Sequence, residues 1–464
     1  MSLIYPAEWN PLPADLAEPL VRICRLVEEA GGQVWLVGGS VRDLAMQRQL
    51  EDLDLEVFGL PAEDLQACLA KSFELDLVGV SFGILKLRGL PIDVGLPRSE
   101  TKSGHGHRGF AISADPELPL ERAAARRDFT VNAIYWNPLT GEIKDPWGGL
   151  DDLKRGILRH TSAAFSEDPL RVMRAMQFAA RFELRVAPVT VELCRQMELE
   201  GLAGERIWQE WVKLINLGAK PSLGLNFLHE CGWLTHFPEL DALRGCEQDA
   251  IYHPEGDVWV HTLHCMDAFA GERTGDQWED LVVGCAVLCH DLGKPATTKI
   301  AENGRISSRG HEDISVTATT AFLGRLTDNQ KLMADVLPLV QEHMRPNQLF
   351  YSDASSSAIR RLADRVGRID RLVRVARADM FGRPPLPTGD YPAGDWLRAK
   401  AEELAVFKEA EKPLILGRHL IALGAEPGPK FSEILREIYQ AQLAGEFSSQ
   451  SEGEVFAVKL MSKK

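Results

Sequence analysis

Alternating apolar and polar residues predict a β-strand in the segment EDLDLEVFGL, residues 51–60. Side chains alternate between the two faces of a strand, so Leu53 and Leu55 would face a core while Asp52 and Asp54 share the other face. Two neighbouring carboxylates repel each other, and burying them without a partner is costly. The pattern therefore predicts a cation bound between these two aspartates.

A second apolar run, residues 34–37, predicts a strand followed by a diglycine turn and a helix that begins near Ser40. Gly38 and Gly39 let a ligand approach the backbone closely, and the start of a helix favours a bound phosphate. Arg42 follows on the same predicted helix. A tight turn without a ligand is the alternative interpretation of the diglycine.

A third acidic residue, Asp93, ends the strand-like run LKLRGLPIDVG. Together with Asp52 and Asp54 it would form a cage of oxygen ligands that suits Mg²⁺. Two such ions could activate an attacking hydroxyl group and neutralise a leaving pyrophosphate. The alternative is a strand edge whose acidic side chains are solvated.

Basic residues precede another strand-like run, in the segment RAAARRDFTVNAIYWNP. Arg126, Arg127 and Asp128 come before this run, and Asn132 lies within it. Guanidinium groups suit a nucleoside triphosphate because each can bind two oxygens at once. The preceding residues 100–121 are glycine-rich and polar, which predicts a mobile loop.

The segment FSEDPLRVMRAMQFAARF predicts a helix with Asp168 in its first turn and Arg171 three residues later on the same face. An acceptor and a donor side by side can hydrogen-bond the edge of a base. The alternative is an ordinary salt bridge on a helix surface, which is common and contributes little.

Histidine and aspartate residues in the second half of the chain fall on several separate predicted helices. An adjacent His-Asp pair in AVLCHDLGKP supplies nitrogen and oxygen ligands from one turn, which other helices would complete. The candidate metal ligands are His261, His290, Asp291, His311, His343 and Asp379. A divalent transition metal or Mg²⁺ is expected there.

Composition and charge narrow the class of protein. The chain has 464 residues, too many for one hydrophobic core, and its net charge of −15 argues against a protein that coats nucleic acid indiscriminately. No membrane span or secretory signal is predicted, and eight scattered cysteines without a Cys-x-x-Cys pair indicate reduced thiols in a cytoplasmic protein. Arginine repeats between residues 361 and 374 indicate either a basic RNA-binding cluster or an ordinary solvated helix face.

The motifs and their order resemble the class II tRNA nucleotidyltransferases, which are the CCA-adding enzymes, and the related bacterial poly(A) polymerases. The resemblance covers roughly residues 30 to 215 and lies in LVGGSVRD, DLDLEV, RRDFTVNA, DPWGGLDDL, EDPLRVMRA and ERIWQEW. It implies that Asp52 and Asp54 bind catalytic Mg²⁺ with Asp93 beside them, and that the substrates are the tRNA 3′ end, CTP and ATP. The nucleotide-binding residues that it implies are Gly38, Gly39, Arg42, Arg126, Arg127, Asp128, Asn132, Asp168, Arg171 and Arg174.

The fragment HDLGKP resembles the HD phosphohydrolase superfamily. This resemblance implies phosphatase and 2′,3′-cyclic phosphodiesterase activities, and a metal ion bound by His261, His290, Asp291 and Asp379. His311 and His343 would support a second ion. An inactive HD fold that only helps to bind tRNA is the alternative.

The expected fold class is α+β, with a small mixed or antiparallel sheet in a head and helices in the rest of the chain. The predicted domains are a nucleotidyltransferase head (1–150), a helical neck (151–218), an HD-type body (219–385) and an RNA-binding tail (386–464). The predicted function is CCA addition to tRNA. The alternatives are an A-adding specialist or a poly(A) polymerase and, in another class, an HD phosphohydrolase or RNA-repair protein whose head only binds RNA. No membrane partner is expected, and the sequence carries no prediction of oligomeric state.

Overall fold

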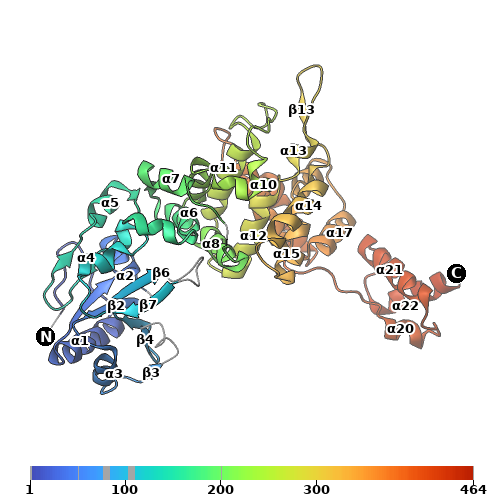
Figure 1. Ribbon diagram of the computed structural model, residues 1–464. Coiled ribbons are helices and arrows are strands. Elements are labelled where there is room, and N and C mark those ends of the chain that lie inside the picture. Colours follow the sequence, from blue (N-terminus) through green and yellow to red (C-terminus); the bar gives the residue numbers. More distant parts are fainter. Residues whose placement is uncertain (1–2, 51, 77–83, 103–109, 200, 463–464) are drawn as a thin grey trace. The chain divides into compact units, whose positions relative to one another are not determined.

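The computed structural model of the chain describes residues 3–50, 52–76, 84–102, 110–199 and 201–462 (Figure 1). The chain divides into two units, one formed by Met1–Trp211 and Leu223–Trp233, the other by Val212–Ser222 and Leu234–Lys464. Each unit is described by itself. The division into four domains stays a prediction.

A seven-stranded mixed sheet forms the base of the first unit, in the order β3-β4-β5-β2-β1-β8-β9. Its strands are β1 (Gln33–Val37), β2 (Leu53–Phe58), β3 (Leu75–Asp76), β4 (Ile84–Leu87), β5 (Ile92–Gly95), β8 (Tyr135–Trp136) and β9 (Ile143–Lys144). Strand β2 pairs antiparallel with β1 and parallel with β5. The predicted strands at 34–37 and 51–60 are therefore confirmed, and β2 lies at the centre of the sheet.

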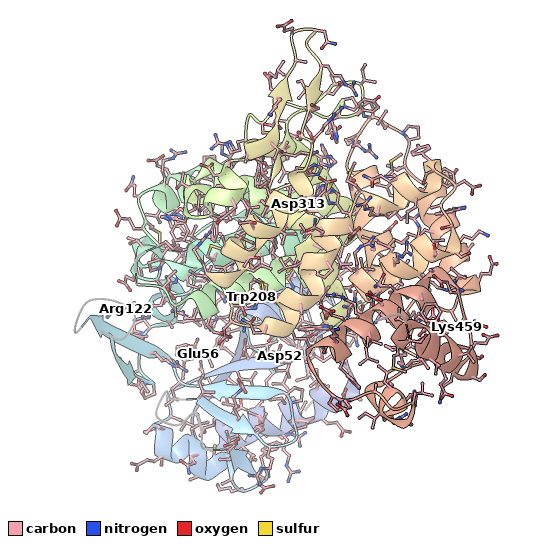
Figure 2. All side chains as sticks on the ribbon, turned by 90° about the vertical axis from the view of Figure 1, so that its right-hand side faces the viewer. Asp52, Glu56, Arg122, Trp208, Asp313 and Lys459 are labelled. Carbon is pink, nitrogen blue, oxygen red and sulfur yellow. The ribbon has the colours of Figure 1, made fainter. Side chains whose placement is uncertain are left out.

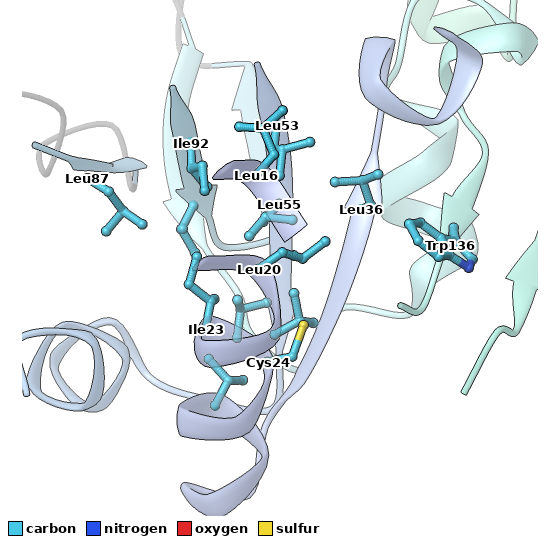
Figure 3. Packing of buried hydrophobic residues seen from close by; sticks show 14 of the residues in the cluster. Leu16, Leu20, Ile23, Cys24, Leu36, Leu53, Leu55, Leu87, Ile92 and Trp136 are labelled. Atoms are coloured by element: carbon cyan, nitrogen blue, oxygen red, sulfur yellow. The ribbon is translucent and has the colours of Figure 1, made fainter. Parts of the chain in front are cut away.

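Strand β2 keeps its register because its apolar face is fully enclosed. Leu53 and Leu55 are buried against helix α1 (Ala14–Glu29), which contributes Leu16 and Leu20 to the same core (Figure 3). Each buried leucine contributes about 2 kcal/mol. A slip of one residue would move the leucines to the polar face and the aspartates into the core.

The other helices and strands of residues 39–236 belong mainly to the first unit. They are α2 (Gly39–Ala45), α3 (Ala62–Leu69), β6 (Arg98–Lys102), β7 (Phe110–Ala114), α4 (Leu120–Ala125), the 3-10 helix η2 (Thr130–Asn132), α5 (Gly149–Arg155), β10 (Ile157–Leu158), η3 (Ala163–Glu167), α6 (Leu170–Phe182), β11 (Arg185–Val186), α7 (Pro188–Arg195), α8 (Gly204–Leu217), α9 (Pro221–Glu230) and η4 (Trp233–His236).

Three local predictions are wrong in this unit. The expected loop over 100–121 is partly an antiparallel ribbon of β6 and β7, while residues 103–109 lie outside the described residues. Asn132 lies in the 3-10 helix η2 rather than in a strand, because strand β8 begins only at Tyr135. Asp168 precedes helix α6, since Pro169 caps the helix, and its carboxylate accepts a hydrogen bond from the backbone N–H of Leu170 at 3.0 Å.

The second unit is almost entirely helical. Its elements are α10 (Pro238–Asp241), α11 (Val258–Ala270), α12 (Gln277–Cys289), α13 (Lys294–Thr297), β12 (Lys299–Ile300), β13 (Ile306–Ser307), α14 (His311–Gly324), α15 (Gln330–Glu342), α16 (Arg345–Tyr351), α17 (Ser356–Val366), α18 (Ile369–Phe381), α19 (Pro392–Glu403), α20 (Gly417–Ala422), α21 (Pro429–Ala444) and α22 (Gln450–Met461). Helix α12 is buried from Asp280 to Cys289 and packs against α11, α15 and α18. Of the helices in the described ranges, none has the length and apolar character needed to cross a membrane.

Candidate active site and a histidine cluster

The acidic residues of the head lie at one edge of a cavity of about 300 Å³ in the first unit. Asp54 and Asp93 both line it, and they are register partners on the parallel strands β2 and β5, so their side chains lie on the same face of the sheet. Asp52 is exposed immediately before β2, and Glu56 follows Asp54 by two residues (Figure 2). The three predicted carboxylates thus come from neighbouring positions, as expected.

Electrostatics at this edge favour a cation. Partial burial and the negative charge of Asp52 raise the pKa of the Asp54 carboxyl, and the charge of Asp93 adds to the effect. Lys86 forms an exposed ion pair with Asp93, with Nζ 2.9 Å from Oδ2. Clustered carboxylates that repel one another are the oxygen ligands that Mg²⁺ prefers, so these residues fit the predicted ion.

The diglycine turn lies directly over the acidic residues. Gly38 has a φ of 68°, and a Cβ atom at this position would be 3.0 Å from Arg127 Nη1 and 3.5 Å from Asp54 Oδ2. Any larger residue would be strained and would fill the space above the carboxylate. Ser40, at the start of α2, accepts a hydrogen bond on Oγ from the backbone N–H of Asp54 at 2.9 Å. The sequence interpretation missed Ser40, although a hydroxyl residue after a diglycine is a recognisable signal.

Two arginines provide the positive side of the same cavity. Arg126 and Arg127 line it, and Arg127 Nη2 lies 3.5 Å from Glu56 Oε2. Glu56 was not predicted as a site residue, although it continues the alternation that begins with Asp52 and Asp54. The cavity therefore offers guanidinium groups opposite carboxylates, which suits a metal-bound triphosphate.

Four other predicted nucleotide-binding residues bind one another in a chain. Arg42 Nη1 donates to Asn132 Oδ1 at 2.7 Å, Asn132 Nδ2 donates to Asp128 Oδ1 at 2.9 Å, and Arg174 Nε donates to Asp128 Oδ2 at 2.8 Å. Although burial opposes the shift, the charge of Arg174 and the hydrogen bond from Asn132 lower the pKa of Asp128. Arg42 also packs on the ring of Phe182. Arg42, Asn132 and Asp128 are buried, and Arg174 is the half-buried end of this chain of contacts.

Asp168 and Arg171 bind different partners. Arg171 donates from Nη1 to the carbonyl oxygen of Ala164 and from Nη2 to that of Arg126, each at 2.8 Å. Asp168 Oδ2 lies 3.4 Å from Nη2 of Arg206 on α8. Sequence reasoning missed Arg206 as a partner, although it belongs to the quoted segment ERIWQEW.

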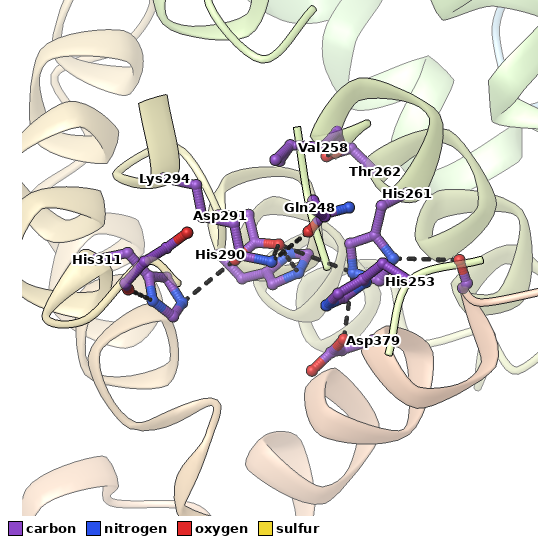
Figure 4. Close-up of polar contacts among 12 residues, drawn as sticks. Gln248, His253, Val258, His261, Thr262, His290, Asp291, Lys294, His311 and Asp379 are labelled. Carbon is purple, nitrogen blue, oxygen red and sulfur yellow. Dashed lines mark hydrogen bonds and ion pairs between the residues drawn. The ribbon is translucent and has the colours of Figure 1, made fainter. Parts of the chain in front are cut away.

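The six predicted metal ligands of the second unit come together in one buried cluster, and Figure 4 labels five of them, all except His343. His261 Nε2 lies 3.2 Å from Asp379 Oδ1, and His290 Nε2 lies 3.1 Å from Asp291 Oδ2. His311 Nε2 lies 3.2 Å from His343 Nε2 and 3.3 Å from Asp291 Oδ1. They come from helices α11, α12, α14, α15 and α18 or from their ends, so tertiary packing assembles the cluster.

Backbone carbonyl groups orient three of these rings. The Nδ1 atoms of His290, His343 and His311 lie 2.7, 2.7 and 2.8 Å from the carbonyl oxygens of Val287, Val340 and Ser308, respectively. Because a carbonyl oxygen only accepts, each Nδ1 carries the hydrogen of the neutral ring and each Nε2 keeps a lone pair. All three Nε2 atoms face other cluster residues.

The protonation states of the cluster also suit a metal. His290 Nε2 and both Asp291 carboxylate oxygens are buried, and their near neighbours are each other, His311 Nε2 and Lys294 Nζ. Burial and the nearby His290 lower the pKa of His343 to about 3, so it is neutral at pH 7. Despite burial, the neighbouring His290 and Lys294 hold the pKa of Asp291 well below its usual range. His343 and Asp291 are therefore in the forms that bind metal ions. Although burial opposes both shifts, Cys265 and Asp379 raise the pKa of His261, and Asp291 raises that of His311, so these two rings would release a proton on binding a metal ion.

A cavity of about 560 Å³ opens beside this cluster. It is lined by Asp291, His311 and His343 from the cluster, together with Lys294 and His253. Lys294 Nζ lies 2.7 Å from Asp291 Oδ2, and its position in HDLGKP was a signal that the sequence interpretation did not use. Basic groups next to metal ligands suit a phosphate group.

The arginine repeats of α17 and α18 form salt bridges within the second unit. Arg365 binds Glu342 at 2.6 Å, and Arg371 binds Glu279 at 2.7 Å. Arg374 binds Asp280 at 2.5 Å. These arginines therefore join helices to one another, a role that the sequence interpretation did not consider.

Comparison with known proteins agrees with this geometry. Residues 34–159 match the family model of the poly A polymerase head domain. The chain is 36% identical to the multifunctional CCA protein of Xanthomonas campestris pv. campestris strain B100 over 427 residues, 89% of this chain and 98% of that protein. It is also 36% identical to the multifunctional CCA protein of Stenotrophomonas maltophilia strain R551-3 over 381 residues, 79% of this chain and 90% of that protein.

Solved structures share the fold. The crystal structure of the Bacillus stearothermophilus CCA-adding enzyme in complex with CTP matches with a TM-score of 0.67 and 22% identity, over 97% of this chain and 99% of that chain. The Thermotoga maritima CCA-adding enzyme complexed with tRNA matches with a TM-score of 0.58 and 18% identity, over 97% and 96% of the two chains. The predicted α+β fold is confirmed. The extent and identity of the sequence matches show that this chain belongs to the multifunctional CCA protein family, among the class II CCA-adding enzymes.

Proposed function

We propose that this protein is a tRNA nucleotidyltransferase that adds CCA to the tRNA 3′ end from CTP and ATP. Its relatives are multifunctional CCA proteins, and proteins of the same fold have been solved with CTP and with tRNA. The observation that carries the proposal is the pairing of Asp54 with Asp93 across β2 and β5, beside a cavity that Arg126 and Arg127 also line.

Asp52 and Asp54 would hold Mg²⁺, with Asp93 beside them. Bound there, divalent ions activate the attacking 3′-hydroxyl of tRNA and neutralise the leaving pyrophosphate. Arg126 and Arg127 would bind the triphosphate oxygens, and the absence of a side chain at Gly38 leaves room for them.

Base selection would depend on the neck residues. Asp168 can accept a hydrogen bond from the exocyclic amine that cytosine and adenine share, and Arg171 can donate to a ring acceptor. Neither guanine nor uracil offers that arrangement. Arg174 is the half-buried end of the chain of contacts through Asp128 and would reach the nucleotide from α6.

Stepwise nucleotide addition tests this proposal. Transcripts of tRNA that end at the discriminator base and at CC are incubated with Mg²⁺ and each nucleotide in turn. We expect two CTP additions and then one ATP addition on the shorter transcript. ATP addition only to the CC-ending transcript would indicate an A-adding specialist, and repeated ATP addition a poly(A) polymerase. No incorporation of any nucleotide would contradict all three.

A second function, hydrolysis of phosphate esters, is supported by the histidine cluster. The buried nitrogen and oxygen atoms that converge at His290 and Asp291 would hold a divalent transition metal or Mg²⁺, which supplies an activated water molecule. Lys294 in the adjoining cavity would bind the phosphate. Hydrolysis of p-nitrophenyl phosphate should require added metal after chelation and should be lost in Asp291→Asn. Hydrolysis that persists in this variant would favour an inactive HD fold.

A cytoplasmic location and a four-domain organisation complete the proposal. All eight cysteines are free and seven of them are buried, as in a reducing compartment. Residues 1–150 would form the catalytic head and 151–218 the base-selecting neck. Residues 219–385 would form the metal-binding body, and 386–464 a tail that binds RNA.

A further inference from the structure

A buried glutamate outside the six predicted ligands joins two histidines. Glu255 lies in the loop before α11, and its side chain has no exposed surface. Its Oε1 atom lies 2.9 Å from His253 Nδ1 and 2.8 Å from His261 Nδ1. A single carboxylate oxygen therefore contacts a histidine that lines the cavity and a histidine of the metal cluster.

The contact fixes which nitrogen of His261 faces the cluster. His261 Nδ1 also lies 3.1 Å from the carbonyl oxygen of Gly382, so two acceptors surround this nitrogen. An acceptor pair requires hydrogen on Nδ1, which leaves Nε2 as the metal-binding atom. That Nε2 atom lies 3.2 Å from Asp379 and 3.8 Å from Asp291.

The loop that carries Glu255 is itself held in place. Asp257 caps α11 by accepting a hydrogen bond from the backbone N–H of Val260 at 2.9 Å, and its other oxygen accepts one from Gly245 at 2.6 Å.

We propose that Glu255 is a positioning residue of the histidine cluster, whose carboxylate holds His261 in the orientation and tautomer that bind metal. The proposal rests on the proposed phosphate-ester hydrolysis at this cluster. Carboxylates that orient a ligating histidine raise metal affinity about 10- to 100-fold. The same oxygen contacts His253, so loss of Glu255 should also release a residue that lines the cavity.

Titration of the metal-free full-length chain with Co²⁺ tests this role. All variants carry Asp54→Asn to remove binding at the head, and calorimetry and visible absorption report Co²⁺ bound by histidine. We expect Glu255→Ala to weaken binding about 10- to 100-fold. Glu247→Ala is the matched control because Glu247 is exposed in the segment that leads to the same loop, and its affinity should equal that of the parent.

A coupling measurement separates positioning from a general loosening of the fold. In a His261→Gln background, Glu255→Ala should no longer change the residual Co²⁺ affinity, because the residue through which it acts is absent. If Glu255→Ala lowered the Co²⁺ affinity equally with His261 present and in the His261→Gln background, the proposal would be overturned. If Glu255→Ala fails to fold, Glu255→Gln is used instead, because glutamine keeps the shape of the side chain without its charge. The Glu255→Gln variant should bind Co²⁺ several-fold more weakly than the parent protein. Unchanged affinity in that variant would equally overturn it.

Failure of the underlying function has a different outcome. Parent protein that binds Co²⁺ no better than Asp291→Asn would overturn both the metal site and the role of Glu255. Parent protein that binds Co²⁺ tightly, with Glu255→Ala unchanged, would overturn only the role of Glu255.

Discussion

Asp54 illustrates how a functional residue costs stability at the scale of one side chain. Because its folded-state pKa is raised, the ionised form is disfavoured by folding, and the penalty grows as the pH rises above the unfolded pKa and is complete above the folded pKa. We expect Asp54→Asn to abolish CCA addition, with a loss of at least about 10³-fold. In chelator at pH 7 the variant should be at least as heat-stable as the wild type.

The control for this prediction is added Mg²⁺. It should raise the unfolding temperature of the wild type more than that of Asp54→Asn, because binding to the folded state alone stabilises it. A variant that is less stable than the wild type in chelator would show that Asp54 is a structural residue.

The pKa shift of Asp128 on folding has the opposite sign to that of Asp54. Its folded-state pKa is lowered, so its contribution to stability is present above the unfolded pKa and is lost as the pH falls through the lower folded value. We expect Asp128→Asn to destabilise the first unit by about 2–3 kcal/mol at pH 7, because it breaks the chain between Arg174 and Asn132. Calorimetry should show this difference unchanged between about pH 5 and 8 and shrinking below about pH 4. A constant difference at all pH values would contradict the assignment.

The sequence predicted the identity of site residues better than their contacts. Asp54, Asp93 and His261 could be predicted because carboxylates and imidazoles in apolar segments need a compensating partner. Arg206 and Glu255 could not be predicted as partners, because their contacts arise from the approach of segments that are distant in the chain or held in a loop.

At the scale of an element, strand β2 shows what periodicity can and cannot predict. Its alternation corresponds to a strand, whereas η2 and the β6–β7 ribbon differ from prediction. Strand β6 has the polar sequence RSETK, so no apolar alternation reveals it, whereas β7 has the apolar sequence FAISA, a signal that the loop prediction did not use. Asn132 is held in its short helix by a tertiary hydrogen bond from Arg42 and a local one to Asp128, neither of which the strand-like sequence pattern reveals.

The same strand predicts a stability change. Leu55 is buried in the core against α1, so Leu55→Ala should destabilise the first unit by about 2–5 kcal/mol through lost burial and a residual cavity. Urea unfolding measures the change. Val458→Ala, at a half-exposed position on α22, should stay within about 0.5 kcal/mol of the wild type. Equal effects of the two substitutions would mean that β2 is not part of a closed core.

At the scale of the whole molecule, two sites built from different units should work independently. Asp54→Asn should lose nucleotide addition and keep hydrolysis of p-nitrophenyl phosphate, and Asp291→Asn should show the reverse pattern. Side-by-side assays of both activities in both variants measure this. Loss of both activities in either variant would show that the two sites depend on each other.

The internal salt bridges of α17 and α18 affect how strongly RNA binding by this acidic protein should depend on salt concentration. Binding of RNA by free lysine or arginine releases counterions, so affinity falls steeply as salt concentration rises. Arg365, Arg371 and Arg374 are already neutralised by glutamate or aspartate and release few counterions on contact with RNA. These three arginines should therefore contribute little to the salt dependence of tRNA binding by this protein.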